Sequence, residues 1–133
     1  MDNQRSEDAR RREELAQAHA RHESGQAQRL IDDFIAAATE QHVQPEPLFA
    51  TTHGGTRVKT DKVGWYIRKN RSIAVGTDGG YYILTVPVAG GLLTRFRGVK
   101  LEPSLPPLVV GRGGRDGETG PLAEFLERRL AAG

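Results

Sequence analysis

The chain has 133 residues, 37% hydrophobic and 27% charged, which suits one folded domain with a modest core, and its net charge of +2 indicates no particular partner. The absence of cysteine excludes disulfides, thiolate chemistry and cysteine-ligated zinc, so we expect a reducing, cytoplasmic location. No segment resembles a signal peptide or reaches the length of a membrane span, so neither secretion nor a membrane partner is expected.

Positive charge is concentrated in the middle of the chain. Residues 1–40 carry six basic and nine acidic side chains, a net of −3, whereas residues 41–133 carry thirteen and eight, a net of +5. Between Arg57 and Lys100 nine basic side chains face two acidic ones, a net of +7. Arginine outnumbers lysine fifteen to four. This ratio suits bidentate recognition of phosphate, although codon bias in a GC-rich genome would produce the same ratio.

The N-terminal third is predicted to be helical. Ser6 to Gln41 are almost all helix formers and no proline precedes Pro45, so we expect one helix, or two with a break at Ser24 and Gly25. The break would divide the chain into a charged arm, residues 1–24, partly disordered or exposed, and a single α+β domain, residues 25–133. After it, apolar residues recur at helical spacing and need a partner surface: Ala27, Leu30, Ile31, Phe34, Ile35 and Ala38.

A connector and then three strands are expected next. Prolines, glycines and polar residues from Gln44 to Gly55 predict the connector. β-branched and aromatic residues predict strands at Val63–Arg68, Ser72–Thr77 and Tyr81–Val86. A three-residue turn centred on Asn70 would join the first two strands. Asp78-Gly79, as a two-residue type I′ turn, would join the second and third.

The two turns assign side chains to the faces of the sheet. Because side chains alternate along a strand, pairing outward from each turn fixes which residues lie together. One predicted face is apolar, with Trp65, Ile67, Ile73, Val75, Tyr82 and Leu84. The other is mixed, with Tyr66, Arg68, Ser72, Ala74, Gly76, Tyr81, Ile83 and Thr85.

The last third of the chain is predicted to complete the sheet and cover it. A fourth strand is expected at Leu92–Arg97, with Val99–Leu101 as its continuation, and Leu108–Val110 is a last strand or a buried extended segment. After the glycine-rich loop Gly111–Gly120, Thr119 or Gly120 would cap a helix with Pro121 at its first position. That helix carries an apolar stripe, Leu122, Phe125, Leu126 and Leu130. The predicted class is α+β: an antiparallel meander of four to five strands packed by an N-terminal helix and a short C-terminal helix.

Basic and aromatic side chains on the mixed face suggest a binding surface. Single-stranded nucleic acids are bound by aromatic rings that stack on bases and by cations that contact the backbone. We therefore predict a non-catalytic binding module with nucleic acid, RNA first, as its partner. The predicted contacts are Arg57, Lys59, Lys62, Tyr66, Arg68, Lys69, Arg71 and Tyr81. If helices cover both faces of the sheet, the tyrosines are core residues instead.

Two alternatives stay open. A protein-interaction or regulatory module would use the exposed helix Ser6–His22. A small enzyme or anion binder would use the loop Gly111–Gly120, whose backbone N–H groups lead into a helix N-terminus and whose candidate residues are Arg112, Gly113, Gly114 and Arg115. The loop matches neither a P-loop nor a dinucleotide fingerprint, and Asp116 and Glu118 would repel phosphate, so a flexible connector is the competing interpretation.

Catalytic, metal and cofactor sites are not predicted. The four histidines, His19, His22, His42 and His53, show no metal-ligand spacing beside suitable carboxylates. No serine lies in a nucleophile elbow or has an evident base. The sequence leaves the oligomeric state undefined.

Overall fold

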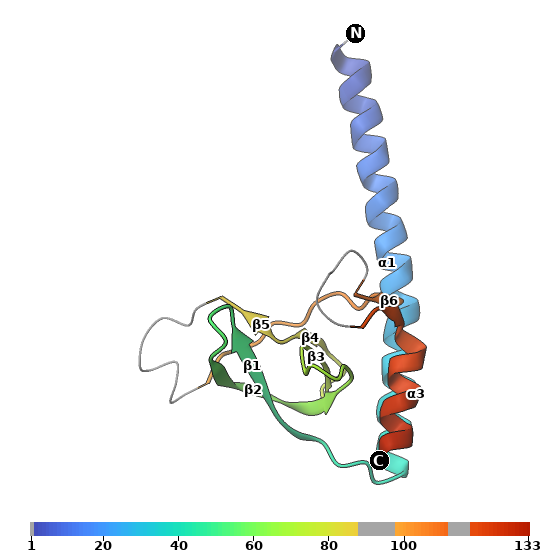
Figure 1. The fold of residues 1–133 in the computed structure, drawn as a ribbon. Helices are drawn as coiled ribbons and strands as arrows, with labels where there is room; N and C mark the ends of the chain where they lie inside the picture. The colour runs from blue at the N-terminus through green and yellow to red at the C-terminus, as the bar shows by residue number, and fades with distance from the viewer. Residues whose placement is uncertain (1, 88–97, 112–117) are drawn as a thin grey trace.

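The computed structural model, which describes residues 2–87, 98–111 and 118–133, combines a long N-terminal helix, a five-stranded, mostly antiparallel sheet and a short C-terminal helix (Figure 1). The predicted α+β class is confirmed. The predicted strand Leu92–Arg97 and the predicted anion-binding residues Arg112, Gly113, Gly114 and Arg115 lie outside the described residues.

Helix α1 (Asp2–Glu40) is continuous over 39 residues, so the predicted break at Ser24 and Gly25 is wrong. The Ser24 hydroxyl donates to the carbonyl of Ala20 at 2.8 Å, which satisfies this polar side chain within the helix. Residues 3–22 are exposed and extend beyond the rest of the molecule (Figure 1). The first half of the helix is therefore an exposed arm.

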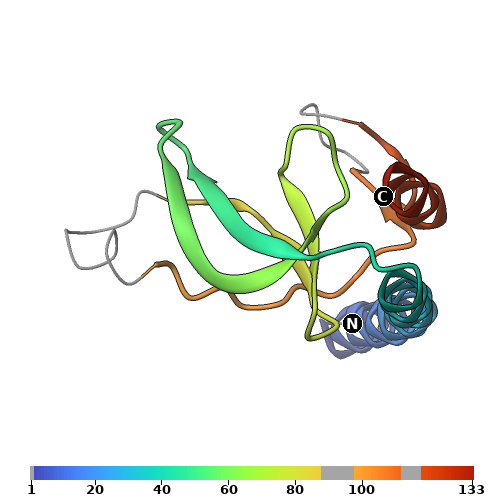
Figure 2. The same cartoon turned by 90° about the horizontal axis from the view of Figure 1, so that it is seen from below.

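The second half of α1 carries the predicted apolar stripe and packs it. Ala27, Ile31, Phe34 and Ala38 are buried, and α3 (Leu122–Ala132) lies alongside this half of the helix (Figures 1 and 2). The helix ends where His42 adopts φ 58°, and the Val43 N–H bonds to the carbonyl of Ala38 at 2.8 Å. This is the geometry of a Schellman motif, which turns the chain toward the sheet.

The expected connector contains a strand, β1 (Glu46–Thr52), so that prediction is wrong. Leu48, Ala50 and Thr52 are buried, with the period of two that a half-buried strand requires. Pro47 misled the prediction, since proline is rare in central strands. It is tolerated here because the register of the β1–β2 pair shifts between Pro47 and Phe49.

The sheet closes on itself. Its strand order is β4-β3-β2-β1-β5, with β2 (Arg57–Tyr66), β3 (Ile73–Gly76), β4 (Tyr81–Ile83) and β5 (Thr85–Val86). Leu84 alone separates the two edge strands. Its N–H donates to Ser72 O at 2.8 Å, and its carbonyl accepts from Thr51 N at 2.7 Å. One continuous segment therefore completes both edges, and β1 and β5 run parallel.

The predicted pairing is correct at the first turn and wrong at the second. Trp65 pairs with Val75 as expected, but Val75 pairs with Tyr81, and Tyr82 pairs with Ala74. The second turn has three loop residues rather than two. Gly79 adopts φ 89° while Asp78 does not have positive φ, so the loop is a type I turn with a glycine bulge instead of type I′.

The observed register differs by one residue from the predicted one, so Tyr81 and Tyr82 lie on the opposite faces of the sheet from those predicted, and each face packs into a separate core. The first core lies between the sheet and the two helices and contains Ala27, Ile31, Phe34, Ala38, Val43, Trp65, Ile67, Ile73, Val75, Tyr81, Val110, Leu122, Phe125 and Leu126. The second core lies inside the closed sheet and contains Leu48, Ala50, Val58, Ala74, Tyr82, Leu84 and Leu101. Both helices contribute to the first core, which also confirms the predicted C-terminal stripe.

A small hairpin joins the C-terminal segment to α3. Strands β6 (Val109–Val110) and β7 (Gly120–Pro121) pair, which confirms the predicted last strand. Pro121 is the N-cap of α3 in extended conformation rather than its first helical residue. Val99 forms an isolated parallel bridge with Thr60. The segment after it is held by the Leu101 N–H, which donates to the Asp61 carboxylate at 2.9 Å.

Candidate functional site

The two tyrosines of the predicted interface lie on opposite faces of the sheet, so the prediction that they share a face is wrong. Tyr81 belongs to the helix-covered core and is 3% exposed, and burial raises its pKa to about 12. Tyr66 is half-buried, and its hydroxyl accepts the Phe49 N–H at 2.8 Å. Tyr81 thus offers no ring face to a nucleic-acid base.

The predicted cations separate into distinct environments. Arg57 and Lys59 are exposed at the start of β2, where the Arg57 guanidinium lies 3.9 Å from the centre of the Phe49 ring. Lys62 is 3.6 Å from the Asp61 carboxylate and 3.8 Å from that of Asp78. Lys62 is therefore neutralised locally, whereas the first two are available to a partner.

A basic patch forms where the β2–β3 turn meets the end of α3. It consists of Lys69 and Arg71 from the turn and Arg128 and Arg129 from the helix, and a groove beside Tyr66 is lined by three of the four cations. Among the described residues that line this groove, Glu118 is the only carboxylate. The Arg128 guanidinium donates to it at 2.8 Å, which lowers the pKa of the Glu118 carboxyl.

Sequence reasoning missed Arg128 and Arg129. They belong to the C-terminal helix, and Arg129 lies in its last turn, where the helix dipole stabilises a cation, so neither stands out as a binding residue. No spacing in the sequence links them to Lys69. The tertiary packing of α3 beside the β2–β3 turn brings these cations together.

Arg71 occupies an unusual backbone conformation in this turn. Its φ of 58° lies in the left-handed region, which costs a residue other than glycine about 1–2 kcal/mol. The Asn70 side-chain oxygen supports the turn by accepting the Ser72 N–H at 3.1 Å. The guanidinium of Arg71 lies 5.4 Å from the centre of the Tyr66 ring. The turn thus holds a cation over an aromatic ring despite the backbone strain.

Arg68 is separate from the patch because its side chain is buried. It is 8% exposed, and its Nε and Nη2 both donate to the carbonyl of Glu118, at 3.1 and 2.6 Å. Its Nη1 donates to Ser72 Oγ at 3.1 Å. Arg68 therefore tethers the C-terminal segment to the sheet, a role that the sequence did not suggest.

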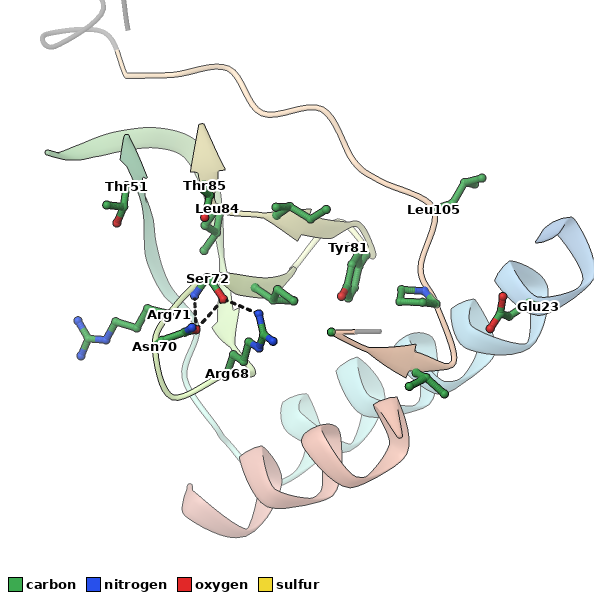
Figure 3. Close-up of a pocket in the computed structure, with 15 residues that line it drawn as sticks. Glu23, Thr51, Arg68, Asn70, Arg71, Ser72, Tyr81, Leu84, Thr85 and Leu105 are labelled. Carbon is green, nitrogen blue, oxygen red and sulfur yellow. Dashed lines mark hydrogen bonds between the residues drawn. The ribbon is translucent and has the colours of Figure 1, made fainter. Parts of the chain in front are cut away.

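A cleft of about 630 Å³ lies beside Arg68 (Figure 3). Strand β4 and the β2–β3 turn form one side, and the C-terminal segment from Leu105 to Gly111 forms the other, with Glu23 of α1 at one end. Tyr81 and Arg68 both point into it (Figure 3). The volume is within the range of sites for small organic ligands, about 300–1,000 Å³.

Metal chemistry gains no support from the part of the chain that the structure describes, where no group of three or more histidine or acidic side chains could hold an ion. Neither described helix is both long and apolar enough to cross a membrane. Comparisons with protein-family models, with curated proteins and with solved structures each gave no match.

Proposed function

We propose that this protein is a non-catalytic binding module that holds nucleic acid, with RNA as the leading partner, at the basic patch formed by Lys69, Arg71, Arg128 and Arg129. The observation that carries the proposal is the convergence of Lys69, Arg128 and Arg129, from two elements distant in the sequence, around a groove with a single carboxylate among its described residues, while Arg71 lies beside the groove over Tyr66. Contacts of cations with phosphates supply most of the affinity in sequence-independent binding.

Two pairs of an arginine and an aromatic ring provide the second line of support. The guanidinium of Arg71 lies over Tyr66, and that of Arg57 lies over Phe49. Both arginines are exposed, and unpaired RNA bases stack on guanidinium planes. In this proposal the two cation–aromatic pairs take the role that the sequence assigned to exposed tyrosine rings.

The strained backbone of Arg71 fits the same role. Glycine would avoid the cost of φ 58° at this position, yet the chain has a large cation there. Strained residues that persist often serve a function. Presentation of a guanidinium over Tyr66, beside the groove, is consistent with such a function.

A salt titration with single-stranded polyuridylate tests the proposal. In the intact protein the logarithm of the binding constant should fall steeply with the logarithm of salt concentration. Replacing Lys69 and Arg129 with alanine should make that slope shallower by about 1.4, since each single-strand phosphate contact contributes about 0.7. The matched control is Arg10→Ala with Arg11→Ala, which removes the same charge from the exposed arm. A flat slope in the intact protein, or an equal change in the control, would contradict binding at the patch.

A second candidate function is protein recognition through the arm. It is favoured by one observation: residues 3–22 form regular helix yet are exposed throughout, and Leu15 within them is 70% exposed. An exposed helix with apolar side chains such as Leu15 offers a surface on which another protein can dock. A photo-crosslinking residue in place of Leu15, in the full chain, should attach to a specific partner in cells. Crosslinking no stronger than from position 63, another exposed apolar site, would count against this role.

A further inference from the structure

Arg68 is a buried cation for which the described part of the chain provides no carboxylate. Its three hydrogen bonds to described residues all end on neutral oxygens, the Glu118 carbonyl and the Ser72 hydroxyl. Neither Glu118 nor Glu23 pairs with it: the first carboxylate binds Arg128 and the second accepts the Leu108 N–H at 3.4 Å. Burial of an ion without an opposite charge is costly, so this position favours an anion from outside the chain.

The geometry leaves Arg68 able to bind such an anion. A guanidinium has five N–H donors, and the described residues accept three of them, so two remain among the described residues. Gly111 provides the space, because a Cβ at that position would lie 2.7 Å from Arg68 Nη2. The guanidinium points into the cleft, and the Tyr81 hydroxyl, a further donor, approaches from the opposite side (Figure 3). A carboxylate has the shape to accept from this kind of planar donor group.

The remainder of the cleft combines polar side chains with exposed apolar ones that a ligand can contact. Its lining includes Ile83, 50% exposed, and Leu105, 70% exposed. These are two of the four large hydrophobic side chains that are exposed in the described residues. A cleft that combines apolar walls with a few directed polar groups is the usual form of a small-molecule site.

The charges in the cleft favour a single negative charge on the ligand. Arg71 lines the rim, but its guanidinium points away from the cleft, so Arg68 is the cation that faces a ligand among the described residues (Figure 3). Glu23 at the far end would repel a second negative charge. A doubly charged phosphate ester is therefore disfavoured relative to a monocarboxylate.

We propose that this cleft binds a small organic acid, with its carboxylate on Arg68 and its apolar body against Ile83 and Leu105. The site is separate from the basic patch and does not depend on nucleic-acid binding. It differs also from the predicted anion-binding residues Arg112, Gly113, Gly114 and Arg115, since the described residues that line it come from α1, the sheet, the β2–β3 turn and the segment that ends at Gly111.

Titration with octanoate, followed by the amide resonances of the isotope-labelled full chain, tests this site. Octanoate should shift the signals of Ile83 and Gly111 and the Nε–H signal of Arg68, with saturation. Octanamide, which keeps the apolar chain and lacks the charge, should bind at least tenfold more weakly. Inorganic phosphate, which lacks the apolar chain, should cause no saturable shift there. Equal affinity for octanoate and octanamide would refute the role of Arg68, and no saturable shift with octanoate would refute the site.

Variants at the rim test the placement without disturbing the core. Leu105→Asp should weaken octanoate binding at least tenfold, because it removes an apolar contact and adds a negative charge at the opening. Leu15→Asp is the matched control, since Leu15 is equally exposed on the distant arm and should leave the affinity unchanged. A direct change of Arg68 also removes the tether to Glu118, so Leu105 is the cleaner position. Unchanged affinity in Leu105→Asp would place any bound octanoate outside this cleft and overturn the proposal.

Discussion

The hydrogen bond between Tyr82 and Asp78 is expected to stabilise the closed sheet in a pH-dependent way. The Tyr82 hydroxyl, from a side chain only 1% exposed, donates to Asp78 Oδ2 at 2.6 Å. Partial burial raises the pKa of Asp78, but the bonds from Tyr82 and from the Gly80 N–H outweigh it and lower that pKa below 3.8. Burial and the neighbouring carboxylate raise the pKa of Tyr82, so its hydroxyl stays protonated at neutral pH.

Replacement of Tyr82 by phenylalanine removes this bond and keeps the ring. Hydrogen bonds to charged groups contribute about 1.5–3 kcal/mol, and the lower end applies because the Asp78 side chain is 47% exposed to water. We therefore expect Tyr82→Phe to lower the free energy of unfolding by about 1.5 kcal/mol at neutral pH. Urea denaturation, with the midpoint and slope compared between variants, measures this loss.

The pH dependence gives the sharper test. A lowered carboxyl pKa contributes stability that is present above the ordinary value of 3.8 and lost as the pH falls through the lowered value. The penalty of Tyr82→Phe should thus shrink in acid, where Asp78 becomes neutral. In a cycle with Asp78→Asn, the two changes should be less costly together than the sum of each alone. A penalty that is independent of pH, or strictly additive changes, would refute the reasoning.

Two further predictions concern stability. Gly25→Ala should stabilise the protein by about 1 kcal/mol, since Gly25 lies within α1 and no atom is near its Cβ position. Gly64→Ala should instead cost at least about 3 kcal/mol, because its Cβ would overlap the Val75 carbonyl. Thermal melts compare the two variants, and similar melting temperatures would contradict the packing at Gly64. Deletion of residues 2–20 should change the free energy of unfolding by less than about 0.5 kcal/mol, because residues 3–20 are exposed. A larger loss of unfolding free energy, measured by urea denaturation, would mean that the arm packs on the domain.

Elements with a strong local pattern were predictable from the sequence. The apolar stripes of α1 and α3 are buried as expected, because a helix with one apolar side has a single way to cover it. The turn centred on Asn70 also gave the correct register, since its side chain accepts the Ser72 N–H and fixes a three-residue loop.

The second turn shows how a single local interaction changes a predicted surface. Asp78-Gly79 is typical of a type I′ turn, but the Asp78 carboxylate accepts from the Gly80 N–H and from Tyr82, which favours the other turn type. The observed register therefore differs by one residue from the predicted one, and Tyr81 and Tyr82 each lie on the face that was predicted for the other. Turn type depends here on a contact with the next strand, which the dipeptide alone does not encode.

The candidate site was only partly predictable for a similar reason. Lys69 and Arg71 were identified because they lie in a basic segment of the sequence. Arg128 and Arg129 joined them only through the docking of α3. Arg68 was expected on a surface, yet it is buried because the Glu118 carbonyl, fifty residues away in sequence, accepts two of its N–H groups.

The double attachment of Leu84 has a consequence for association between copies of the protein. Because the peptide groups of Leu84 bond to both Ser72 and Thr51, neither end of the strand order presents a free row of donors and acceptors there. Exposed rows of this kind recruit strands from other chains. Release of the segment 81–86 would uncover two such rows at once. Exchange of this segment between molecules is therefore a direct route from the folded chain to a domain-swapped dimer or an aggregate.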